Sequence, residues 1–141
     1  MSSSELTEDQ QRWAKQAHHF ETNVHFNRTS KLRVDRWDDQ MVIMTLPHEE
    51  WKCNSTESFH GGVIASLADT CGSAASLAAI GGTGYIATVS MQINYLNAAT
   101  TTITATGVCI KRGKRLQVAE VKVVDANGKL VADATITTMQ P

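Results

Sequence analysis

The segment FHGGVIASLADTCG, residues 59–72, combines residue types that could do chemistry. His60 and two glycines begin an apolar run of small residues, and Asp69 stands in the middle of it. Asp69 is the only acidic residue between Ser58 and Ala119. An ionised carboxylate is costly to bury unless it is paired, so close packing around it favours a functional role. The alternative is that Asp69 faces a solvated groove and that His60 simply begins a helix.

The spacing of His60 and Asp69 constrains any joint role. Nine positions of helix correspond to about 13 Å along the axis and roughly 900° of rotation, which places the two side chains on opposite faces. They cannot both reach one reacting carbonyl from the same helix, because catalytic contact needs about 3 Å. If both act in one site, Asp69 must come from a second subunit. A two-fold dimer with facing helices would then have two equivalent sites.

Gly61 and Gly62, directly after His60, suit the polarisation of a carbonyl group. A helix N-terminus leaves backbone N–H groups unpaired and carries a positive partial charge. Without a Cβ atom at these positions, a ligand oxygen can approach the N–H groups as in an oxyanion hole. A tight junction between a loop and a helix would use paired glycines equally well.

Two helices are predicted from capping and stop signals. Thr7 and Gln10 form a capping-box pattern at the start of a helix over 8–20. A second, apolar helix over 61–80 is ended by Gly81-Gly82-Thr83-Gly84. Its small, apolar residues are typical of a helix buried inside a protein.

The remaining runs read as antiparallel strands. An early hairpin turns at Asp38-Asp39, with Leu32, Val34 and Arg36 expected on one face of its first strand. Turn sequences typical of hairpins, such as Asn127-Gly128, lie between the later β-rich runs. Four β-rich runs follow the apolar helix: 85–96, 101–111, 116–125 and 129–139. A sheet wide enough to wrap that helix gives the α+β class.

The bulk composition is that of an ordinary globular chain. It has 141 residues and a formal net charge of −1, so no global field favours nucleic acid or an anionic membrane. Cys53, Cys71 and Cys109 show neither CxxC spacing nor a disulfide framework. The N-terminal segment lacks the pattern of a secretory signal, and the stretch 62–80 is too rich in small polar residues for a lipid-facing span. We therefore expect a cytoplasmic protein without nucleic-acid or membrane partners.

The motif HGG with an aspartate nine positions after its histidine, followed by ATVSMQINYLNAA, resembles the hotdog-fold acyl-CoA thioesterases of the phenylacetate-degradation (PaaI) type. The resemblance covers about residues 48–139, including the closing segment KRGKRLQVAEVKVVDANGKLVADATITT. It implies a curved antiparallel sheet that wraps one long helix, with two protomers pairing their sheets. We expect residues 1–141 to form one hotdog domain, with an N-terminal helix over about 7–20 and a core over about 30–139.

The resemblance also implies roles for residues near the motif. Asn54 matches a loop residue that helps to hold the thioester end of the substrate, and His60 matches a histidine that orients this loop and the carbonyl. Gly61 matches the residue whose backbone N–H polarises the thioester carbonyl. Asp69, from the opposite subunit, matches the carboxylate that acts as nucleophile or as general base for water. From the residues alone, Asn54 is equally typical of a loop turn.

Two hydroxyl residues match positions that assist this carboxylate in relatives. Ser73, one helical turn beyond Asp69, matches one of them, and Thr88, in the next strand, matches the other; subfamilies differ in which they use. The alternatives are a bond from Ser73 to the carbonyl four residues earlier and a purely structural Thr88. Cys71 is expected to be a small buried residue, because no activating histidine lies at local spacing.

The one local cluster of cations is the turn KRGKR. In the family this hairpin lies near the mouth where the phosphates of coenzyme A emerge, and cations there would attract them. The alternative is a solvated hairpin end whose charges discourage edge pairing. The residues expected to contact coenzyme A are those of this turn and the second glycine of the motif: Lys111, Arg112, Lys114, Arg115 and Gly62.

The sequence thus predicts an acyl-CoA thioesterase that releases a carboxylic acid and coenzyme A. We expect a homodimer with shared active sites, assembled into a homotetramer, and no metal or other cofactor, since coenzyme A is part of the substrate. A non-catalytic acyl-CoA sensor is the alternative, against which Asp69 argues because binding alone needs no carboxylate. A hotdog dehydratase or hydratase is the weaker enzyme alternative, because its local motif is absent from the sequence. Short aliphatic, medium-chain and aryl acyl groups all stay open.

Overall fold

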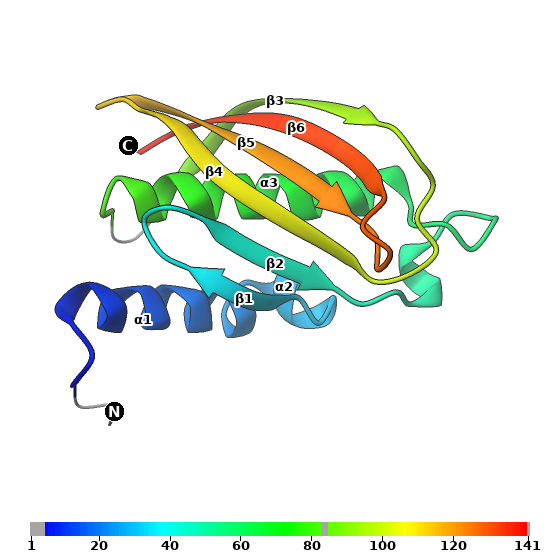
Figure 1. The fold of residues 1–141 in the computed structure, drawn as a ribbon, viewed down its shortest axis with the longest axis horizontal. Coiled ribbons are helices and arrows are strands. Elements are labelled where there is room, and N and C mark those ends of the chain that lie inside the picture. The colour runs from blue at the N-terminus through cyan, green and yellow to red at the C-terminus, as the bar shows by residue number, and fades with distance from the viewer. Residues whose placement is uncertain (1–4, 83–84, 141) are drawn as a thin grey trace.

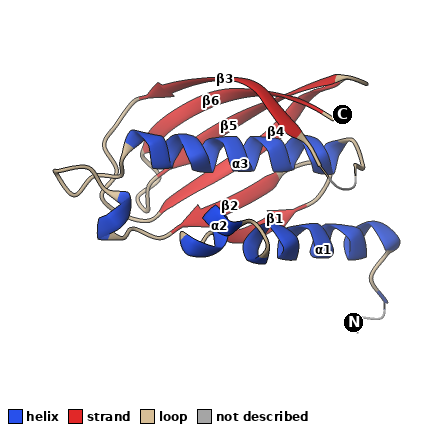
Figure 2. Ribbon diagram, turned by 180° about the vertical axis from the view of Figure 1, so that it is seen from behind, coloured by secondary structure: helices blue, strands red, loops and turns tan. Residues whose placement is uncertain are grey.

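A six-stranded antiparallel sheet arches over one long helix in the computed structural model, which describes residues 5–82 and 85–140 (Figures 1 and 2). The strand order is β1-β2-β4-β5-β6-β3. This is the predicted α+β hotdog architecture, and the predicted N-terminal helix is present. In chain order the elements are α1 (Glu8–Thr22), α2 (His25–Thr29), β1 (Arg33–Trp37), β2 (Val42–Leu46), α3 (Gly61–Ala79), β3 (Ala87–Tyr95), β4 (Ile103–Arg112), β5 (Leu116–Val124) and β6 (Leu130–Met139).

The helix ends follow the predicted capping chemistry. The Thr7 hydroxyl accepts a hydrogen bond from the Gln10 N–H at 3.1 Å, and the Gln10 side chain accepts one from the Thr7 N–H at 2.9 Å. After the C-terminus of α3, Gly81 adopts φ +64°, the left-handed conformation that glycine adopts without strain. Of the predicted stop signal, Thr83 and Gly84 lie outside the described residues.

The small residues of α3 let it lie very close to the sheet. A Cβ atom at Gly107 in β4 would come within 2.9 Å of the Cys71 carbonyl oxygen, and one at Gly72 would come within 2.9 Å of Cβ of Ile136 in β6. Although α3 is long and apolar enough to span a membrane, 61% of its most apolar window is buried inside the fold. A core helix has the same length and composition.

The first strand corrects one sequence-based expectation. Arg36 is exposed, and Trp37, with 8% of its surface accessible, fills the core position in its place. The reason is a β-bulge: Val34 pairs with Met44, but Arg36 pairs with Ile43. The extra residue on β1 shifts the alternation of faces by one position. A bulge leaves no period-2 signal, so simple alternation placed Arg36 instead of Trp37 on the face of Leu32 and Val34.

Strand β3 forms one edge of the sheet, because it pairs with β6 alone among the described strands. Its side chains are mostly exposed, including Val89, Met91 and Tyr95. An edge strand with large apolar side chains and an unpaired backbone is a template for pairing with another strand.

Candidate active site

The N-terminus of α3 is built by His60 and the two glycines that follow it. His60 is the N-cap residue, and its Nδ1 accepts a hydrogen bond from the Gly62 N–H at 2.9 Å. The histidine therefore begins the helix, as the simpler interpretation held. The Gly61 N–H makes no hydrogen bond to any residue that the structure describes. It is one of the unpaired donors of a helix start, at the positive end of the helix dipole.

A buried lysine fixes the loop that leads into this helix. Lys52 has no accessible surface, and its Nζ donates to the carbonyl oxygens of Ser30 and Pro47 at 2.6 and 2.7 Å. It also pairs with Glu49 at 2.7 Å. The Lys52 carbonyl in turn accepts from the His60 N–H at 2.8 Å. The position of the helix start thus depends on a buried lysine to which the sequence analysis gave no role.

The carboxylate of Asp69 contacts Thr88 directly, and Ser73 contacts Thr88. Thr88 Oγ1 in β3 donates to Asp69 Oδ1 at 2.6 Å, and Ser73 Oγ lies 3.2 Å from Thr88 Oγ1. Asp69 is half-buried. The three residues form one chain of polar contacts between α3 and β3, with Thr88 in direct contact with the carboxylate. A hydroxyl donor fixes one carboxylate oxygen and leaves the negative charge uncompensated.

Asn54 lies beside the start of α3, in a loop turn. Its Oδ1 accepts from both the N–H and the hydroxyl of Thr56, at 2.8 and 2.7 Å. The side chain therefore closes a turn, which was the structural alternative for this residue. It also lines a cavity of about 420 Å³ together with Gly61. Asn54 therefore both closes the turn and lies next to the proposed carbonyl-binding position at Gly61.

Tyr95, at the end of β3, is a site residue that sequence reasoning missed. Its hydroxyl donates to the Gly61 carbonyl oxygen at 2.8 Å, and its ring lies where a Gly61 Cβ would meet it at 3.4 Å. It lines the same cavity as Gly61 and Asn54. The only available signal was an exposed aromatic residue at a strand end, in the quoted run ATVSMQINYLNAA. The partner of its hydroxyl is 34 positions away in the chain and could not be read from spacing.

The basic turn lies at the opposite end of α3 from Gly61. Arg112 donates to the Ala79 carbonyl at 3.2 Å and to the Asp39 carbonyl at 3.0 Å. Its guanidinium thus caps the helix C-terminus, where a cation is favourable. Gly61 is the first of 19 residues of that helix, so about 27 Å of helix axis separate the two ends.

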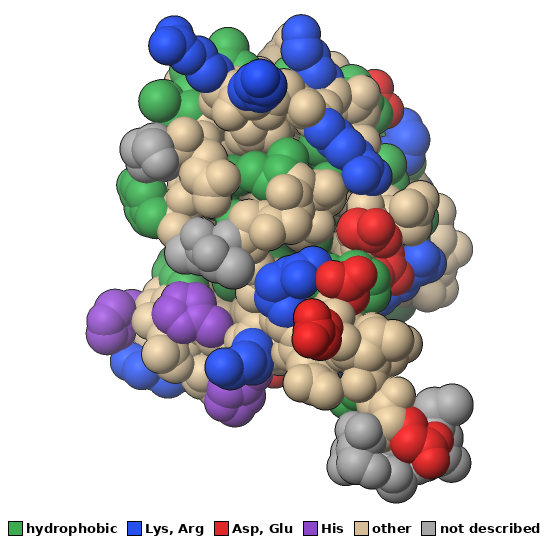
Figure 3. All heavy atoms as spheres, turned by 90° about the vertical axis from the view of Figure 1, so that its left-hand side faces the viewer, with side chains coloured by type: hydrophobic (Ala, Val, Ile, Leu, Met, Phe, Trp, Pro, Cys, Tyr) green, Lys and Arg blue, Asp and Glu red, His purple; other side chains and the backbone are tan. Residues whose placement is uncertain are grey.

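The other three cations of the turn, Lys111, Lys114 and Arg115, are exposed. Figure 3 looks onto this end of the molecule, where Lys and Arg side chains project into solvent. Of the four predicted cations, Arg112 is therefore bound to two backbone carbonyls, and the three others are available to an anion.

The cysteines differ in environment. Cys71 is fully buried, and burial raises the pKa of its thiol to about 12, which confirms it as a core residue. Cys53 lies in the loop, with Sγ 3.2 Å from His48 Nε2, a pair that the sequence analysis did not consider. Over residues 5–82 and 85–140, no three His, Cys, Asp or Glu side chains come together as a metal site.

The family match decides how this arrangement is to be understood. The family model described as the Thioesterase superfamily matches residues 57–132, more than half of the chain. The chain belongs to the thioesterase superfamily. The matched segment begins just before α3 and contains His60, Gly61 and Asp69. Membership supports thioester hydrolysis as the general type of activity.

Several solved structures share the fold. A related protein from Shewanella oneidensis superposes with a TM-score of 0.85 at 22% identity, covering 93% of this chain and 96% of that one. The E. coli PaaI protein of the phenylacetic acid degradation operon gives 0.84 at 22% identity, covering 93% and 94%. AziG from S. sahachiroi gives 0.75 at 25% identity, covering 82% and 94%. A search of curated proteins found no match.

We predict that Glu49→Gln destabilises the thioesterase fold in a pH-dependent way. Hydrogen bonds from Lys52 and Lys31 lower the pKa of Glu49 from its ordinary 4.5 to about 2. A carboxylate whose pKa falls on folding stabilises the protein above its unfolded pKa, and this is lost as the pH falls toward the folded pKa. The loss of stability in the variant should be full at pH 7 and should shrink between about 4.5 and 2. Urea unfolding at several pH values measures it.

The exposed neighbour Glu50 gives a matched control, since Glu50→Gln removes the carboxylate of the next residue in the chain. It should leave the urea midpoint nearly unchanged at every pH. A Glu49→Gln deficit that stays constant down to pH 3 would show that the ion pair with Lys52 is not its source.

Proposed function

We propose that this chain is an acyl-CoA thioesterase that works as a homodimer with shared active sites. The observation that carries the proposal is the pair of groups on α3, the Gly61 N–H at the helix start and the Asp69 carboxylate held by Thr88. An N–H at a helix start can stabilise the developing charge on a carbonyl oxygen. A fixed carboxylate can attack a thioester or activate water.

The dimer follows from the placement of these groups on one helix. Gly61 is at the first position of α3 and Asp69 lies eight residues further along, which is about 12 Å of helix axis. One protomer therefore cannot bring both to the same carbonyl. The open edge of β3 offers an antiparallel contact for a second copy, and Thr88 ties that strand to Asp69. Pairing of two such edges about a two-fold axis would bring the second α3 alongside the first.

The reaction in such a shared site is a hydrolysis. The thioester oxygen accepts a hydrogen bond from the Gly61 N–H of one protomer. The partner's Asp69 either attacks the carbonyl carbon or removes a proton from the water that attacks it. The C–S bond breaks, and coenzyme A leaves as the thiolate and takes up a proton. Where Asp69 attacked directly, water then hydrolyses the acyl–Asp69 anhydride and restores the carboxylate, so that on either route the acyl group leaves as the carboxylic acid. The Asn54 amide and His60 hold the loop at the carbonyl end.

We predict that Gly61→Pro removes the carbonyl-binding N–H without unfolding the helix. Proline is favoured at the first helical position, and the extended backbone of His60, with φ −61° and ψ 135°, suits a residue before proline. Loss of one oxyanion donor should lower kcat about 10²–10³-fold. Release of free thiol from acyl-CoAs of several acyl types measures it.

Gly61→Ala is the matched control, because it keeps the N–H and its Cβ would make only ordinary contact with Tyr95. It should retain most of the activity. Equal activity of the proline and alanine variants would contradict a role for this N–H. Acyl-CoA binding without thiol release by the unmodified protein would favour the sensor alternative.

We predict that two inactive variants complement each other when their subunits are mixed. Asp69→Asn and Gly61→Pro should each be nearly inactive alone. A hybrid dimer contains one site with an intact Gly61 and an intact Asp69, so random exchange should restore about a quarter of normal activity. Refolding of an equimolar mixture and assay of thiol release measures the recovery. If mixing restores nothing while hybrids form, the two groups act within one protomer or not at all.

We predict that the exposed cations of the basic turn bind the phosphates of coenzyme A. Replacing Lys111, Lys114 and Arg115 by glutamine should raise KM for acyl-CoA about tenfold at low salt, since each exposed contact contributes modestly. Acyl-pantetheine, which lacks the nucleotide, should be unaffected. Arg112→Gln is a separate control, which should lower thermal stability because it removes the helix cap. Equal effects of the triple variant on both substrates would exclude the phosphate contact.

A further inference from the structure

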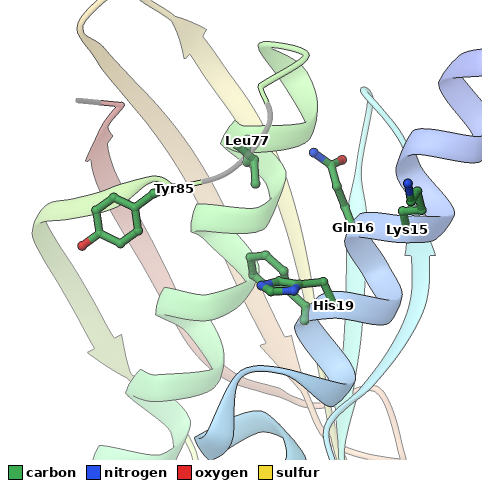
Figure 4. A pocket seen from close by; sticks show the side chains of 6 residues that line it. Lys15, Gln16, His19, Leu77 and Tyr85 are labelled. Atoms are coloured by element: carbon green, nitrogen blue, oxygen red, sulfur yellow. The ribbon is translucent and has the colours of Figure 1, made fainter.

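A pocket of about 550 Å³ lies between α1 and the C-terminal half of α3 (Figure 4). Its volume falls within the range of small-molecule sites, about 300–1,000 Å³. Leu77 from α3, Phe20 from α1 and Tyr85 from the chain before β3 form its apolar walls. Lys15 and His19, both exposed, lie on the α1 side.

Contacts with Trp37 and Gly82 fix the positions of the two α1 residues Phe20 and Gln16, which line this pocket. The Phe20 ring packs edge-on against Trp37, with ring centroids 4.9 Å apart. The Gln16 side chain accepts from Trp37 Nε1 at 3.0 Å and donates to the Gly82 carbonyl at 2.6 Å. These bonds join α1 both to β1 and to the segment that follows α3. The pocket is therefore a fixed feature of the fold, and its filling requires no rearrangement of α1.

The distance from the Asp69 carboxylate to this pocket follows from two parts of the chain, α3 and the segment from Tyr85 to Thr88. On α3, Asp69, Ser73 and Leu77 follow at intervals of four residues and so share one face, with about 12 Å between the first and the last. On the neighbouring chain segment, Thr88 contacts Asp69, and Tyr85, three residues earlier, lines the pocket. Three extended residues span about 10 Å. The two routes place the pocket about 10–12 Å from the carboxylate.

We propose that this pocket receives the far end of a medium-length, unbranched acyl chain. The inference rests on the proposed function, because it takes the carbonyl carbon to lie at Asp69. An extended chain advances about 1.2 Å per bond, so roughly ten bonds are needed to pass from Asp69 to Leu77. A butyryl, benzoyl or phenylacetyl group is too short to reach the walls. An acyl chain of about nine to eleven carbons reaches them.

The lining favours an uncharged tail. Leu77, Phe20 and Tyr85 supply the apolar half of the lining, and Lys15, Gln16 and His19 supply the polar half. No acidic residue lines the pocket among those described. Gln16 has both ends of its amide occupied. Each methylene that leaves water for such a site strengthens binding about fourfold.

The first test is the dependence of kcat/KM on acyl length, from butyryl-CoA to tetradecanoyl-CoA. We expect kcat/KM to rise up to about ten carbons and then to level off. Tyr85→Ala, at an exposed position that can lose its side chain without unfolding the core, should lower kcat/KM for decanoyl-CoA about tenfold through lost apolar contact. It should leave butyryl-CoA unchanged. Phe26→Ala removes another exposed aromatic ring, away from the pocket, and should alter neither.

The outcomes separate the occupants of the pocket. An equal loss for every acyl length in Tyr85→Ala would place the pantetheine arm there and overturn the proposal. A flat length profile in the unmodified protein would also overturn it.

A second measurement does not depend on catalysis. Calorimetric titration with decanoate and with butyrate should show that decanoate binds at least about tenfold more tightly, and that Tyr85→Ala removes this difference. If no acyl-CoA is hydrolysed but decanoate binds in this way, the proposed function fails and the pocket assignment stands. If acyl-CoAs are hydrolysed but decanoate binds no more tightly than butyrate, the pocket assignment fails alone.

Discussion

The close approach of α3 to the sheet is the constraint on which the rest of the structure depends. A side chain at Gly107 would meet the backbone of Cys71, and a side chain at Gly72 would meet Ile136, so even one methyl group would force α3 outward. At the observed depth, Thr88 reaches Asp69 at 2.6 Å. Hydrogen bonds lengthened by a fraction of an ångström lose much of their strength. The glycines in the core thus determine the geometry of a carboxylate that they do not contact.

The sequence predicted the elements whose signals are local. The long helix and the last four strands agree with expectation within two residues at each end, because glycine stops, hairpin turns and alternation act between neighbours in the chain. Arg36 was wrongly placed on the same face as Leu32 and Val34 for the complementary reason. The bulge that turns it outward arises from the pairing of β1 with β2, and pairing is a property of two segments.

In the candidate site too, the sequence identified residues by their local pattern but missed those whose partners are distant in the chain. Gly61 and Asp69 could be singled out by residue type, since a glycine pair and a lone aspartate are anomalous in an apolar helix. Lys52 and Tyr95 could not. Burial of the Lys52 ammonium requires acceptors that include the Ser30 carbonyl, 22 positions away, and a lysine in a polar loop otherwise predicts exposure. The sequence showed which residues could take part in the reaction, but not the hydrogen-bond partners that hold them in position.

The carboxylates of Glu49 and Asp69 illustrate what a hydrogen-bond partner does to the chemistry of an acid. Glu49 is held by two lysines, which lower its pKa to about 2 and make it a weak base suited to a structural ion pair. Asp69 is held by a hydroxyl, and the sequence contains no lysine or arginine from 53 to 110. A neutral donor orients the carboxylate but leaves its charge available to a carbonyl carbon or a water molecule. An adjacent cation would consume that charge in an ion pair. The lack of lysine and arginine in this stretch of sequence is therefore as much a part of the proposed site as Asp69 itself.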